Sequence, residues 1–333
     1  MAKIAVMGAG SWGTTFAKIL ADAGNEVTIW ARRDDLVEEI NDDHRNGDYL
    51  PGIKLPKSLR ANSDAAAVLA DAEQVYLAVP SQSLRSNLQT WGSSIPKDAI
   101  LVSLMKGVEK DTGLRMSEVI AQATEFPAAQ IVVVSGPNLA LEIANEEPAA
   151  SVAASSSKAS ALAVAKAASN SYFTTFTNGD VIGTEFGGIL KNLIAVAIGI
   201  VNGVGYGQNT KASIMTRGLA EISRFAVAYG AKPSTMVGLA GLGDLIATAE
   251  SPLSRNHRAG EMLGKGYTKK EVLKRMSQTA EGLSSVAPVL NLAAEKGVSM
   301  PIVEQVNLVI EGKMNPHDIA PHLTHESEQP QGE

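Results

Sequence analysis

The stretch KIAVMGAGSWGTTFAKILADAGNEVTIWARR, residues 3–33, decides the fold. Residues 3–7 are short, mostly apolar and β-branched, as in a buried strand, and residues 26–30 have the same character. Between them a G-x-G-x-x-G turn (residues 8–13) leads into an expected helix over residues 11–23, whose apolar side chains are spaced to face a sheet. A strand, a glycine turn and a helix in a unit of about thirty residues predict a dinucleotide-binding site.

Each glycine of the turn has its own physical reason. Gly8 allows the tight turn, Gly10 lacks a Cβ and lets a pyrophosphate approach the backbone, and Gly13 lets the helix pack closely on the strand. The N-terminus of the helix offers free N–H groups and a positive dipole end to the phosphates. The alternative is a tight strand-to-helix turn that binds no ligand.

Two arginines follow the second strand, where an NAD-selective fold usually places an acidic residue for the ribose 2′-hydroxyl. Arg32 and Arg33 would instead bind a 2′-phosphate bidentately and stack on the adenine. We therefore expect NADPH to be preferred over NADH. Because Asp34 and Asp35 come next, the alternative is a solvated charge cluster that caps the following helix.

Composition describes a globular chain and excludes several kinds of site. The 333 residues suggest about two domains, and 45% are hydrophobic and 19% charged. The net charge is −6 and the pI is near 5.5, and the sequence has no basic patch of the kind that would indicate binding to a nucleic acid or to an anionic membrane. Cysteine is absent and the five histidines are scattered, so we expect no disulfide and no metal site.

The sequence indicates a cytoplasmic protein without membrane insertion. The N-terminus begins with a strand and lacks the pattern of a secretory signal. The longest apolar run, residues 193–201, is about half the length needed to span a bilayer and is expected to be a core helix.

Strands and helices alternate over the first half of the chain. This alternation predicts a Rossmann-type, mostly parallel sheet covered on both faces, with ligands outside the carboxyl ends of its strands. Further strands are expected near residues 59–61, 74–79, 99–104, 131–134, 150–154 and 172–175, and helices near 34–46, 64–70, 80–91 and 158–169.

Beyond residue 180 the pattern becomes helical, and no convincing strand remains. We expect residues 1–184 to form a dinucleotide-binding domain, residues 185–323 an all-helical substrate and catalytic domain, and residues 324–333 a disordered tail. The expected helices cover residues 180–201, where Asp180 would be the cap, and 210–229, 233–238, 256–264, 268–275, 281–296 and 301–311.

Lys191 is the first candidate for chemistry. Its neighbours on the same helical face, such as Gly187, Ile194 and Ile198, cannot neutralise an ammonium. An ammonium in such a place is costly unless it has a distant partner or a lowered pKa, and a lysine with a lowered pKa suits a proton donor or acceptor near neutral pH. The alternative is a lysine that snorkels at a helix end.

Other candidates follow strands at the edge where ligands are expected. Lys106 comes directly after the strand at 99–104, although it could be a solvated loop lysine. Gly136 and Asn138 follow the strand at 131–134 and could offer N–H and amide groups to a substrate, although the segment could also be a simple helix start.

Polar residues in the helical half complete the set. Asp244 could orient a lysine or merely cap a helix. Ser254, Arg255 and Asn256 suit an anion such as phosphate, or form a solvated basic cap. Glu281 could reach a cofactor or be a surface carboxylate.

Taken together, these motifs resemble NAD(P)-dependent glycerol-3-phosphate dehydrogenase of the bacterial type, over nearly the whole chain to about residue 320. The resemblance implies interconversion of dihydroxyacetone phosphate and sn-glycerol 3-phosphate with NADPH, preferred, or NADH, for glycerophospholipid synthesis. The apolar helical domain is compatible with a homodimer. The stretches that carry it are GAGSWGT (8–14), SLMKGVE (103–109), SGPNLALEIA (135–144), EFGGILKNLIAVAIGI (185–200) and GLGDLIATAESPLSRNHRAG (241–260).

The resemblance also implies roles for single residues. Lys191 would be the proton donor and acceptor. The cofactor would contact Gly8, Gly10, Ser11, Trp12, Gly13, Arg32, Arg33, Tyr49, Lys106, Ala140, Arg255, Thr279 and Glu281. The substrate would contact Lys106, Gly136, Asn138, Lys191, Asp244, Ser254, Arg255 and Asn256. The family varies at Pro137 and Ala140 and often has an apolar residue in place of Thr279.

In the implied mechanism Lys191 protonates the oxygen on which alkoxide charge develops. Lys106 would stabilise that charge and lower the pKa of Lys191, and Asp244 would hold Lys191. Arg255 and Asn256 would bind the phosphate. The alternatives are a β-hydroxyacid dehydrogenase or ketopantoate reductase, which act on carboxylates, and a non-catalytic NADP sensor.

Overall fold

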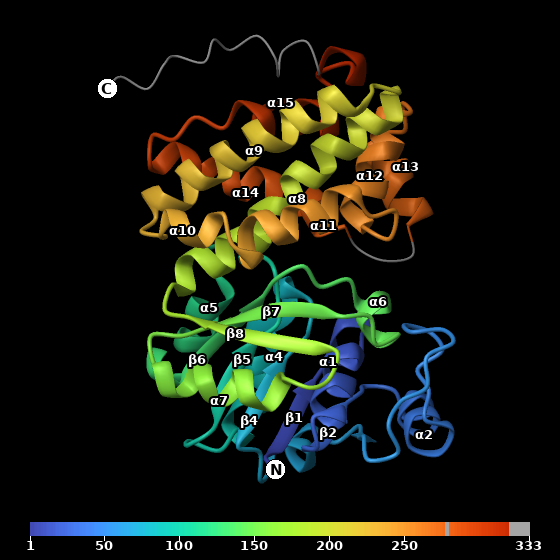
Figure 1. The fold of residues 1–333 in the computed structure, drawn as a ribbon, viewed down its shortest axis with the longest axis vertical. Coiled ribbons are helices and arrows are strands. Elements are labelled where there is room, and N and C mark those ends of the chain that lie inside the picture. Colours follow the sequence, from blue (N-terminus) through green and yellow to red (C-terminus); the bar gives the residue numbers. More distant parts are fainter. Residues whose placement is uncertain (277–279, 320–333) are drawn as a thin grey trace. The chain divides into compact units, whose positions relative to one another are not determined.

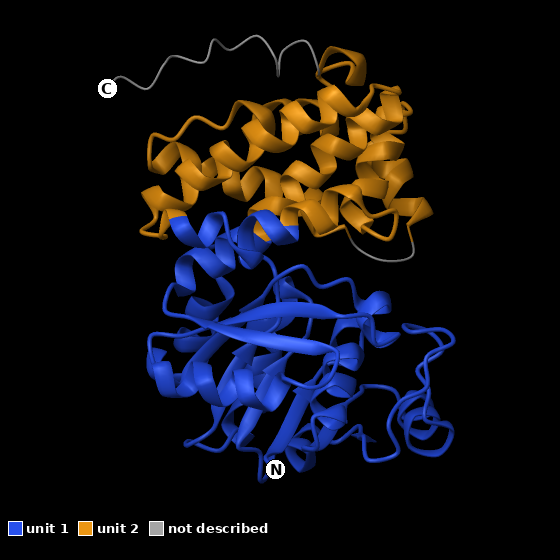
Figure 2. Cartoon of the chain, viewed as in Figure 1, with its two compact units in different colours: residues 1–188, 234–244 blue, residues 189–233, 245–333 orange. Residues whose placement is uncertain are grey.

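The structure, a computed structural model, describes residues 1–276 and 280–319. Two compact units make it up: residues 1–188 with 234–244 (unit 1), and residues 189–233 with those from 245 onward (unit 2), as Figure 2 shows. The functional division after residue 184 stays a prediction. Thr279 and the expected disordered tail at 324–333 lie outside the described residues.

Unit 1 is built on an eight-stranded sheet in the order β3-β2-β1-β4-β5-β6-β7-β8 (Figure 1). Neighbouring strands run parallel except β6 and β7, which confirms the expected Rossmann-type, mostly parallel sheet. The strands are β1 Lys3–Met7, β2 Glu26–Trp30, β3 Arg60–Asn62, β4 Gln74–Leu77, β5 Ile100–Ser103, β6 Ile131–Ser135, β7 Ala149–Ala154 and β8 Phe173–Asn178. The strand order reverses at β1, so the glycine turn that follows β1 lies at the switch point where such sheets bind ligands.

Most helices match their sequence-based ranges, and the described residues after Asn178 contain no strand, as expected. Unit 1 holds α1 Ser11–Asp22, α2 Asp34–Glu38, α3 Ala65–Leu69, α4 Leu84–Trp91, α5 Met116–Thr124, α6 Ala140–Ala144, α7 Lys158–Ala168 and the start of α8 Val181–Val204. Unit 2 holds the rest of α8 and α9 Gln208–Ala228, α11 Asp244–Glu250 apart from its first residue, α12 Arg255–Gly264, α13 Lys269–Arg275, α14 Glu281–Glu295 and α15 Pro301–Ile310. The short α10 Pro233–Met236 lies at a boundary of the units.

The expected helix over residues 34–46 is wrong in its second half. Helix α2 ends at Glu38, a π-helical turn covers Glu39–Asp43, and His44 takes a left-handed conformation with φ 53°. The polar run after residue 40 has no apolar face to bury, and Asn46 is used elsewhere, so nothing sustains the helix. The short helix α5 was not expected from the sequence, because it has no long apolar repeat, and α6 corresponds to the helix start given as the alternative for the segment of Gly136 and Asn138.

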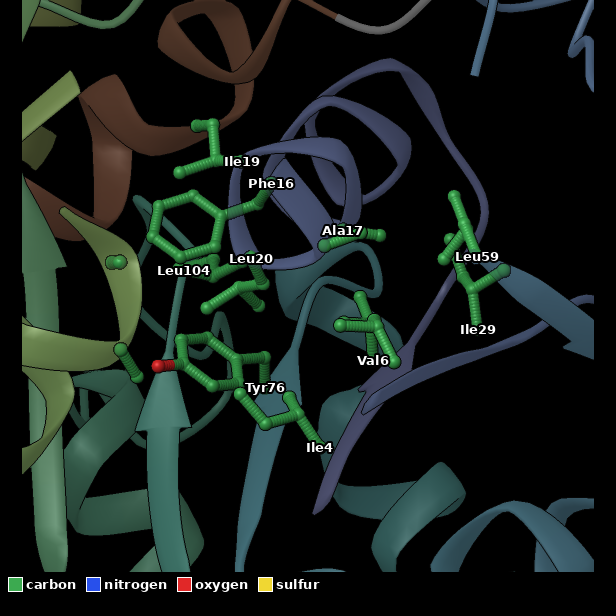
Figure 3. Packing of buried hydrophobic residues seen from close by; sticks show 14 of the residues in the cluster. Ile4, Val6, Phe16, Ala17, Ile19, Leu20, Ile29, Leu59, Tyr76 and Leu104 are labelled. Carbon is green, nitrogen blue, oxygen red and sulfur yellow. The ribbon is translucent and has the colours of Figure 1, made fainter. Parts of the chain in front are cut away.

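The sheet of unit 1 buries side chains on both faces, as strand alternation requires. In β1, Ile4 and Val6 join a cluster with Phe16 of α1, whereas Ala5 and Met7 join the cluster on the other face. Figure 3 shows the first cluster, where the ring of Phe16 lies near that of Tyr76, with centroids 5.3 Å apart. This packing fixes α1, and with it the glycine turn, on the sheet.

Helix α8 is the longest apolar helix and continues from unit 1 into unit 2. Residues 193–201, apart from Gly199, are hydrophobic and fully buried, which confirms the expected core helix. Its length and composition would suit a membrane span, but 83% of its most apolar window is buried in the structure. A buried helix of this kind is the core of a folded unit.

Glycines bring α8 and α12 into backbone contact in unit 2. A Cβ on Gly260 would lie 2.2 Å from the carbonyl oxygen of Val196, and one on Gly199 would lie 2.1 Å from that of His257. Gly203 and Gly264 repeat the contact one turn further along. No larger residue fits there, so these glycines set how the N-terminus of α12 is placed along α8.

Candidate active site

The glycine turn of unit 1 has the geometry of a dinucleotide cradle. Gly8 has φ 125°, and a Cβ there would lie 2.7 Å from the carbonyl oxygen of Ala78. A Cβ on Gly13 would lie 1.9 Å from the oxygen of Gly8, so the helix and the turn are in contact. At Gly10 a Cβ would meet no atom within 4 Å, and no side chain caps α1. Open space beside uncapped N–H groups fits a pyrophosphate.

The segment around Tyr49 is tethered to this turn. The buried Asn46 donates from Nδ2 to the carbonyl oxygen of Ala9 at 3.0 Å and to Oγ1 of Thr14 at 2.8 Å. The Ser11 hydroxyl donates to the Tyr49 carbonyl oxygen at 2.8 Å. These bonds bring Ser11 and Tyr49, two of the expected cofactor residues, together beside the turn.

Trp12 packs rather than projects. Its ring stacks edge-on against Phe16 with centroids 5.3 Å apart, and its indole Nε1 is buried without a partner among the described residues. The residue thus anchors the first turn of α1 on the core, and its ring is only partly exposed.

The two arginines after β2 differ in their surroundings. Arg32 is exposed and its guanidinium has no hydrogen bond or ion pair with a described residue. Arg33 is also exposed, but its Nη2 pairs with Asp48 and its Nε lies 3.6 Å from Asp35. Both lie at the end of β2, where a 2′-phosphate would be read.

Lys106 lies at the carboxyl edge of the sheet, as expected, and is mostly buried. Its Nζ donates to the Gly136 carbonyl oxygen at 3.0 Å and pairs at 2.5 Å with Oδ2 of Asp244, which is 1% exposed. Asp244 therefore orients a lysine, one of the two roles the sequence left open. The expectation that it also holds Lys191 stays a prediction.

Small residues surround Lys106 because there is no room for larger ones. A Cβ on Gly188 of α8 would lie 3.3 Å from Cγ and Cδ of Lys106 and 2.6 Å from the hydroxyl of Ser135. A Cβ on Gly136, which has φ 157°, would lie 3.0 Å from Cα of Ser151. The lysine stem is thus held between the strand end and α8.

A buried ion pair fixes the start of α8 beside this site. Glu185, 4% exposed, accepts from the backbone N–H of Ser117 at 2.9 Å and from its hydroxyl at 2.6 Å, and it pairs with Arg115. Burial raises the pKa of the Glu185 carboxyl, against the opposing effect of the Arg115 guanidinium. These bonds tie α8 to α5 within unit 1.

Asn138 and Ala140 lie in the segment after β6. The Asn138 amide donates from Nδ2 to the Ala150 carbonyl oxygen at 3.3 Å, while its Oδ1 and the Ser135 hydroxyl are buried without partners among the described residues. The Ala140 carbonyl oxygen accepts from Thr15 of α1 at 3.2 Å. Buried polar atoms without partners are a frequent mark of a functional site.

In unit 2, Lys191 is buried on α8 with 6% of its surface exposed. Its ammonium donates a hydrogen bond to Oγ1 of Thr248 in α11. The alternative of a lysine that snorkels into solvent is therefore wrong. A buried ammonium beside a hydroxyl can give and take a proton.

The N-terminus of α12 gathers three expected substrate residues. The Ser254 hydroxyl caps the helix by accepting from the His257 N–H at 3.2 Å. Asn256 is buried and donates to Oδ1 of Asn192 at 2.8 Å, while its own Oδ1 accepts from the Gly282 N–H at 2.9 Å. Arg255 is exposed, and its guanidinium has no partner among the described residues. An uncommitted guanidinium at a helix N-terminus suits a phosphate.

Comparison with known proteins decides the family. Models of the NAD-dependent glycerol-3-phosphate dehydrogenase N-terminus and C-terminus match residues 3–161 and 180–321. The chain belongs to this family.

Similar proteins bear the same name. A glycerol-3-phosphate dehydrogenase [NAD(P)+] of Leifsonia xyli subsp. xyli is 63% identical over 98% of this chain and 89% of its own, and one of Streptomyces griseus is 55% identical over 93% of each. The crystal structure of glycerol-3-phosphate dehydrogenase from Coxiella burnetii is 34% identical, with a TM-score of 0.90 over 97% of this chain and 98% of the other.

Within the glycerol-3-phosphate dehydrogenase fold, each unit holds part of the expected site. Unit 1 holds the glycine turn and also joins Lys106 to Gly136 and Asp244, and unit 2 brings together Lys191, Asn256 and the start of α14. Glu281 is the first residue of α14 and is half-buried. Thr279 lies outside the described residues.

Sequence reasoning missed three polar residues of the site. Thr248 bonds to Lys191, Asn192 to Asn256, and Asn46 to the glycine turn. Only Asn192 carried a signal, because it follows Lys191 directly within the apolar stretch of residues 186–201. Over residues 1–276 and 280–319 there is also no group of three His, Cys, Asp or Glu side chains that could hold a metal.

Proposed function

We propose that the chain catalyses reversible hydride transfer between NADPH and dihydroxyacetone phosphate, giving sn-glycerol 3-phosphate. The observation that carries this proposal is the buried Lys191 ammonium, hydrogen-bonded to Thr248, in a chain of this family. Turnover of a ketone needs a group that delivers a proton to the carbonyl oxygen, and this lysine is that group.

The nucleotide is held by unit 1. The N–H groups at the start of α1 and the open space at Gly10 take the pyrophosphate, and Arg32 and Arg33 take the 2′-phosphate. When bound, the reduced nicotinamide supplies the hydride for the carbonyl carbon. NADH is the second cofactor, because its adenosine lacks only the 2′-phosphate.

The chemistry at the carbonyl oxygen is done by the lysines. Lys191 donates a proton as negative charge develops on this oxygen, and in the reverse direction it takes the proton from the hydroxyl group. Lys106, held by Asp244 and the Gly136 carbonyl oxygen, places a positive charge that stabilises the developing alkoxide. Thr248 keeps the Lys191 ammonium in place.

The phosphate end of the substrate is bound at the N-terminus of α12. The exposed Arg255 guanidinium pairs with the phosphate, and Asn256 is fixed by its bonds to Asn192 and Gly282. Ser254, Gly136 and Asn138 complete the substrate contacts. Binding energy at the phosphate then positions the ketone for reaction.

We also propose that residues 1–184 act as the nucleotide domain and residues 185–323 as the substrate domain of a cytoplasmic homodimer that supplies the backbone of glycerophospholipids. Phosphorylated substrates and nicotinamide nucleotides are charged and do not cross membranes unaided, which favours the cytoplasm. Sedimentation of the purified protein tests the dimer: a single species of monomer mass would contradict it.

The experiment that tests the activity is NADPH oxidation, followed by absorbance, with dihydroxyacetone phosphate as substrate. Ketopantoate serves as the control, because its carboxylate could pair with Arg255 but it lacks a phosphate. We expect turnover with the phosphorylated ketone alone. Turnover with ketopantoate alone would support a reductase of carboxylates, and NADPH binding without any turnover would support a sensor.

A further inference from the structure

One of the two arginines proposed to bind the 2′-phosphate is already engaged. Arg33 pairs with Asp48, and this hydrogen bond, followed by the charge of Asp35, raises the pKa of the Arg33 guanidinium. Arg32, its neighbour, has no partner among the described residues. A 2′-phosphate that arrives at this place therefore finds one guanidinium available and one occupied.

The position of Asp48 is fixed by the residues on either side of it. The Gly47 N–H donates to Oε1 of Glu39 at 2.9 Å, and the Tyr49 carbonyl oxygen accepts from the Ser11 hydroxyl at 2.8 Å. Asp48 thus lies in a turn held at both ends, one end of which is bound to the glycine turn itself. Its carboxylate is presented to Arg33 by this turn.

We propose that Asp48 competes with the cofactor 2′-phosphate for Arg33 and thereby sets the preference between NADPH and NADH. This inference rests on the proposed role of Arg33. Because Asp48 and Asp35 lie on the Nη2 and Nε side of Arg33, a phosphate that binds this guanidinium must either displace the Asp48 carboxylate or lie near it. NADH carries only a hydroxyl there, so it meets neither cost.

The expected size of the effect follows from how far the Arg33–Asp48 pair is exposed to solvent. The side chains of Arg33 and Asp48 are 52% and 59% exposed, so solvent and salt screen the pair. We expect Asp48→Asn to raise the NADPH-to-NADH ratio of kcat/KM about two- to fivefold, the range that exposed ion pairs span. The gain should come from a lower KM for NADPH and shrink at high salt.

The test compares Asp48→Asn with a matched control in the full-length protein. Asp34→Asn removes the same charge from the residue adjacent to Arg33, but the exposed Asp34 side chain makes no hydrogen bond or ion pair with a described residue. Steady-state kinetics are measured with each cofactor. In addition, the affinity for adenosine 2′,5′-bisphosphate is compared with that for adenosine 5′-monophosphate, because the difference reports recognition of the 2′-phosphate without turnover. Arg33→Gln and the double variant Arg33→Gln with Asp48→Asn close a double-mutant cycle.

Four results are expected: a higher NADPH-to-NADH ratio in Asp48→Asn, no matching rise in Asp34→Asn, a lower ratio in Arg33→Gln, and no effect of Asp48→Asn in the Arg33→Gln background. An unchanged or lower ratio in Asp48→Asn overturns this inference but not the proposed role of Arg33. A ratio that rises because KM for NADH rises also overturns it, since Asp48 would then contact the ribose. An unchanged ratio in Arg33→Gln overturns both this inference and the proposed role of Arg33.

Discussion

Glycines in the two units have opposite surroundings. At Gly10 in unit 1 a Cβ would meet nothing within 4 Å, whereas at Gly260 in unit 2 it would lie 2.2 Å from a backbone oxygen. The first glycine leaves space beside a helix N-terminus, and the second removes space between two helices. The same residue type therefore leaves room for the proposed ligand in one unit and allows close helix packing in the other.

Helix N-termini show the same difference. No side chain caps α1, so its first N–H groups stay open for the proposed pyrophosphate. At α15 the buried carboxylate of Glu221 accepts from the N–H groups of Ile302 and Val303 at 3.0 and 3.1 Å. A helix end that the protein satisfies itself supports stability, and one left open supports binding.

The largest expected effect is on the packing glycine. Gly260→Val forces a side chain into the carbonyl oxygen of Val196 and the backbone of Gly199, so α8 and α12 must separate. We expect the free energy of unfolding to fall by about 3 to 4 kcal/mol, measured by urea denaturation. The control is Gly207→Val, where a Cβ meets nothing within 4 Å and the cost is that of a poorer helix cap, about 1 kcal/mol. Equal losses would show that the helix contact is not tight.

Glu221 predicts a pH dependence of stability. Burial raises the pKa of its carboxyl to about 7, although the N–H groups of Ile302 and Val303 act in the opposite direction. The folded protein then binds this proton more tightly than the unfolded chain, so its contribution is present at low pH and is lost as the pH rises from about 4.5 to about 7.

The variant Glu221→Gln has no ionisable group at this position. Comparing it with the wild type therefore isolates the contribution of Glu221 protonation to the free energy of unfolding. The stability advantage of the wild type over the variant should shrink by roughly 2 to 3 kcal/mol between pH 5 and pH 8, measured by urea unfolding at each pH. Other carboxylates titrate in both proteins and cancel. A constant difference across this range would show that Glu221 is ionised throughout.

A smaller effect is expected at the ligand glycine. Gly10→Ala adds a methyl group that touches no protein atom but lies where the pyrophosphate approaches the backbone. The affinity for NADPH, measured by calorimetry, should fall about tenfold, equivalent to about 1.4 kcal/mol. Stability should change by less than about 1 kcal/mol, the cost of alanine at a helix cap. If stability fell strongly while affinity held, the glycine would belong to packing as Gly260 does.

The two kinds of glycine also explain what the sequence could predict. The turn at residues 8–13 was recognisable because a strand precedes it and a helix follows it, and this order is typical of a dinucleotide-binding turn. Gly199 with Gly203, and Gly260 with Gly264, share a four-residue spacing, but that spacing is compatible with many helices until their partner is known. The mostly parallel sheet and most helices followed from alternation and apolar spacing, which are local properties, whereas the order of the strands did not.

The residues of the candidate site were likewise predictable only where the local sequence marks them. Lys106 and Lys191 stood out because one ends a strand and the other interrupts an apolar helix. Asn46 and Thr248 did not stand out. Asn46 bonds to Ala9, 37 residues away in the sequence, and Thr248 bonds to Lys191, 57 residues away, so only the fold brings these partners together. The pairing of Arg33 with Asp48 was not predictable either, because the helix expected over residues 34–46 ends earlier than its pattern indicates.

The most direct test of the account is the kcat of Lys191→Ala for reduction of dihydroxyacetone phosphate, with NADPH binding measured in parallel. The account predicts that kcat falls by roughly 10²-fold or more, the scale of a lost acid–base group, while NADPH still binds because its cradle lies in unit 1. A variant that turns over at the wild-type rate would contradict the role of Lys191, and with it the chemistry proposed here.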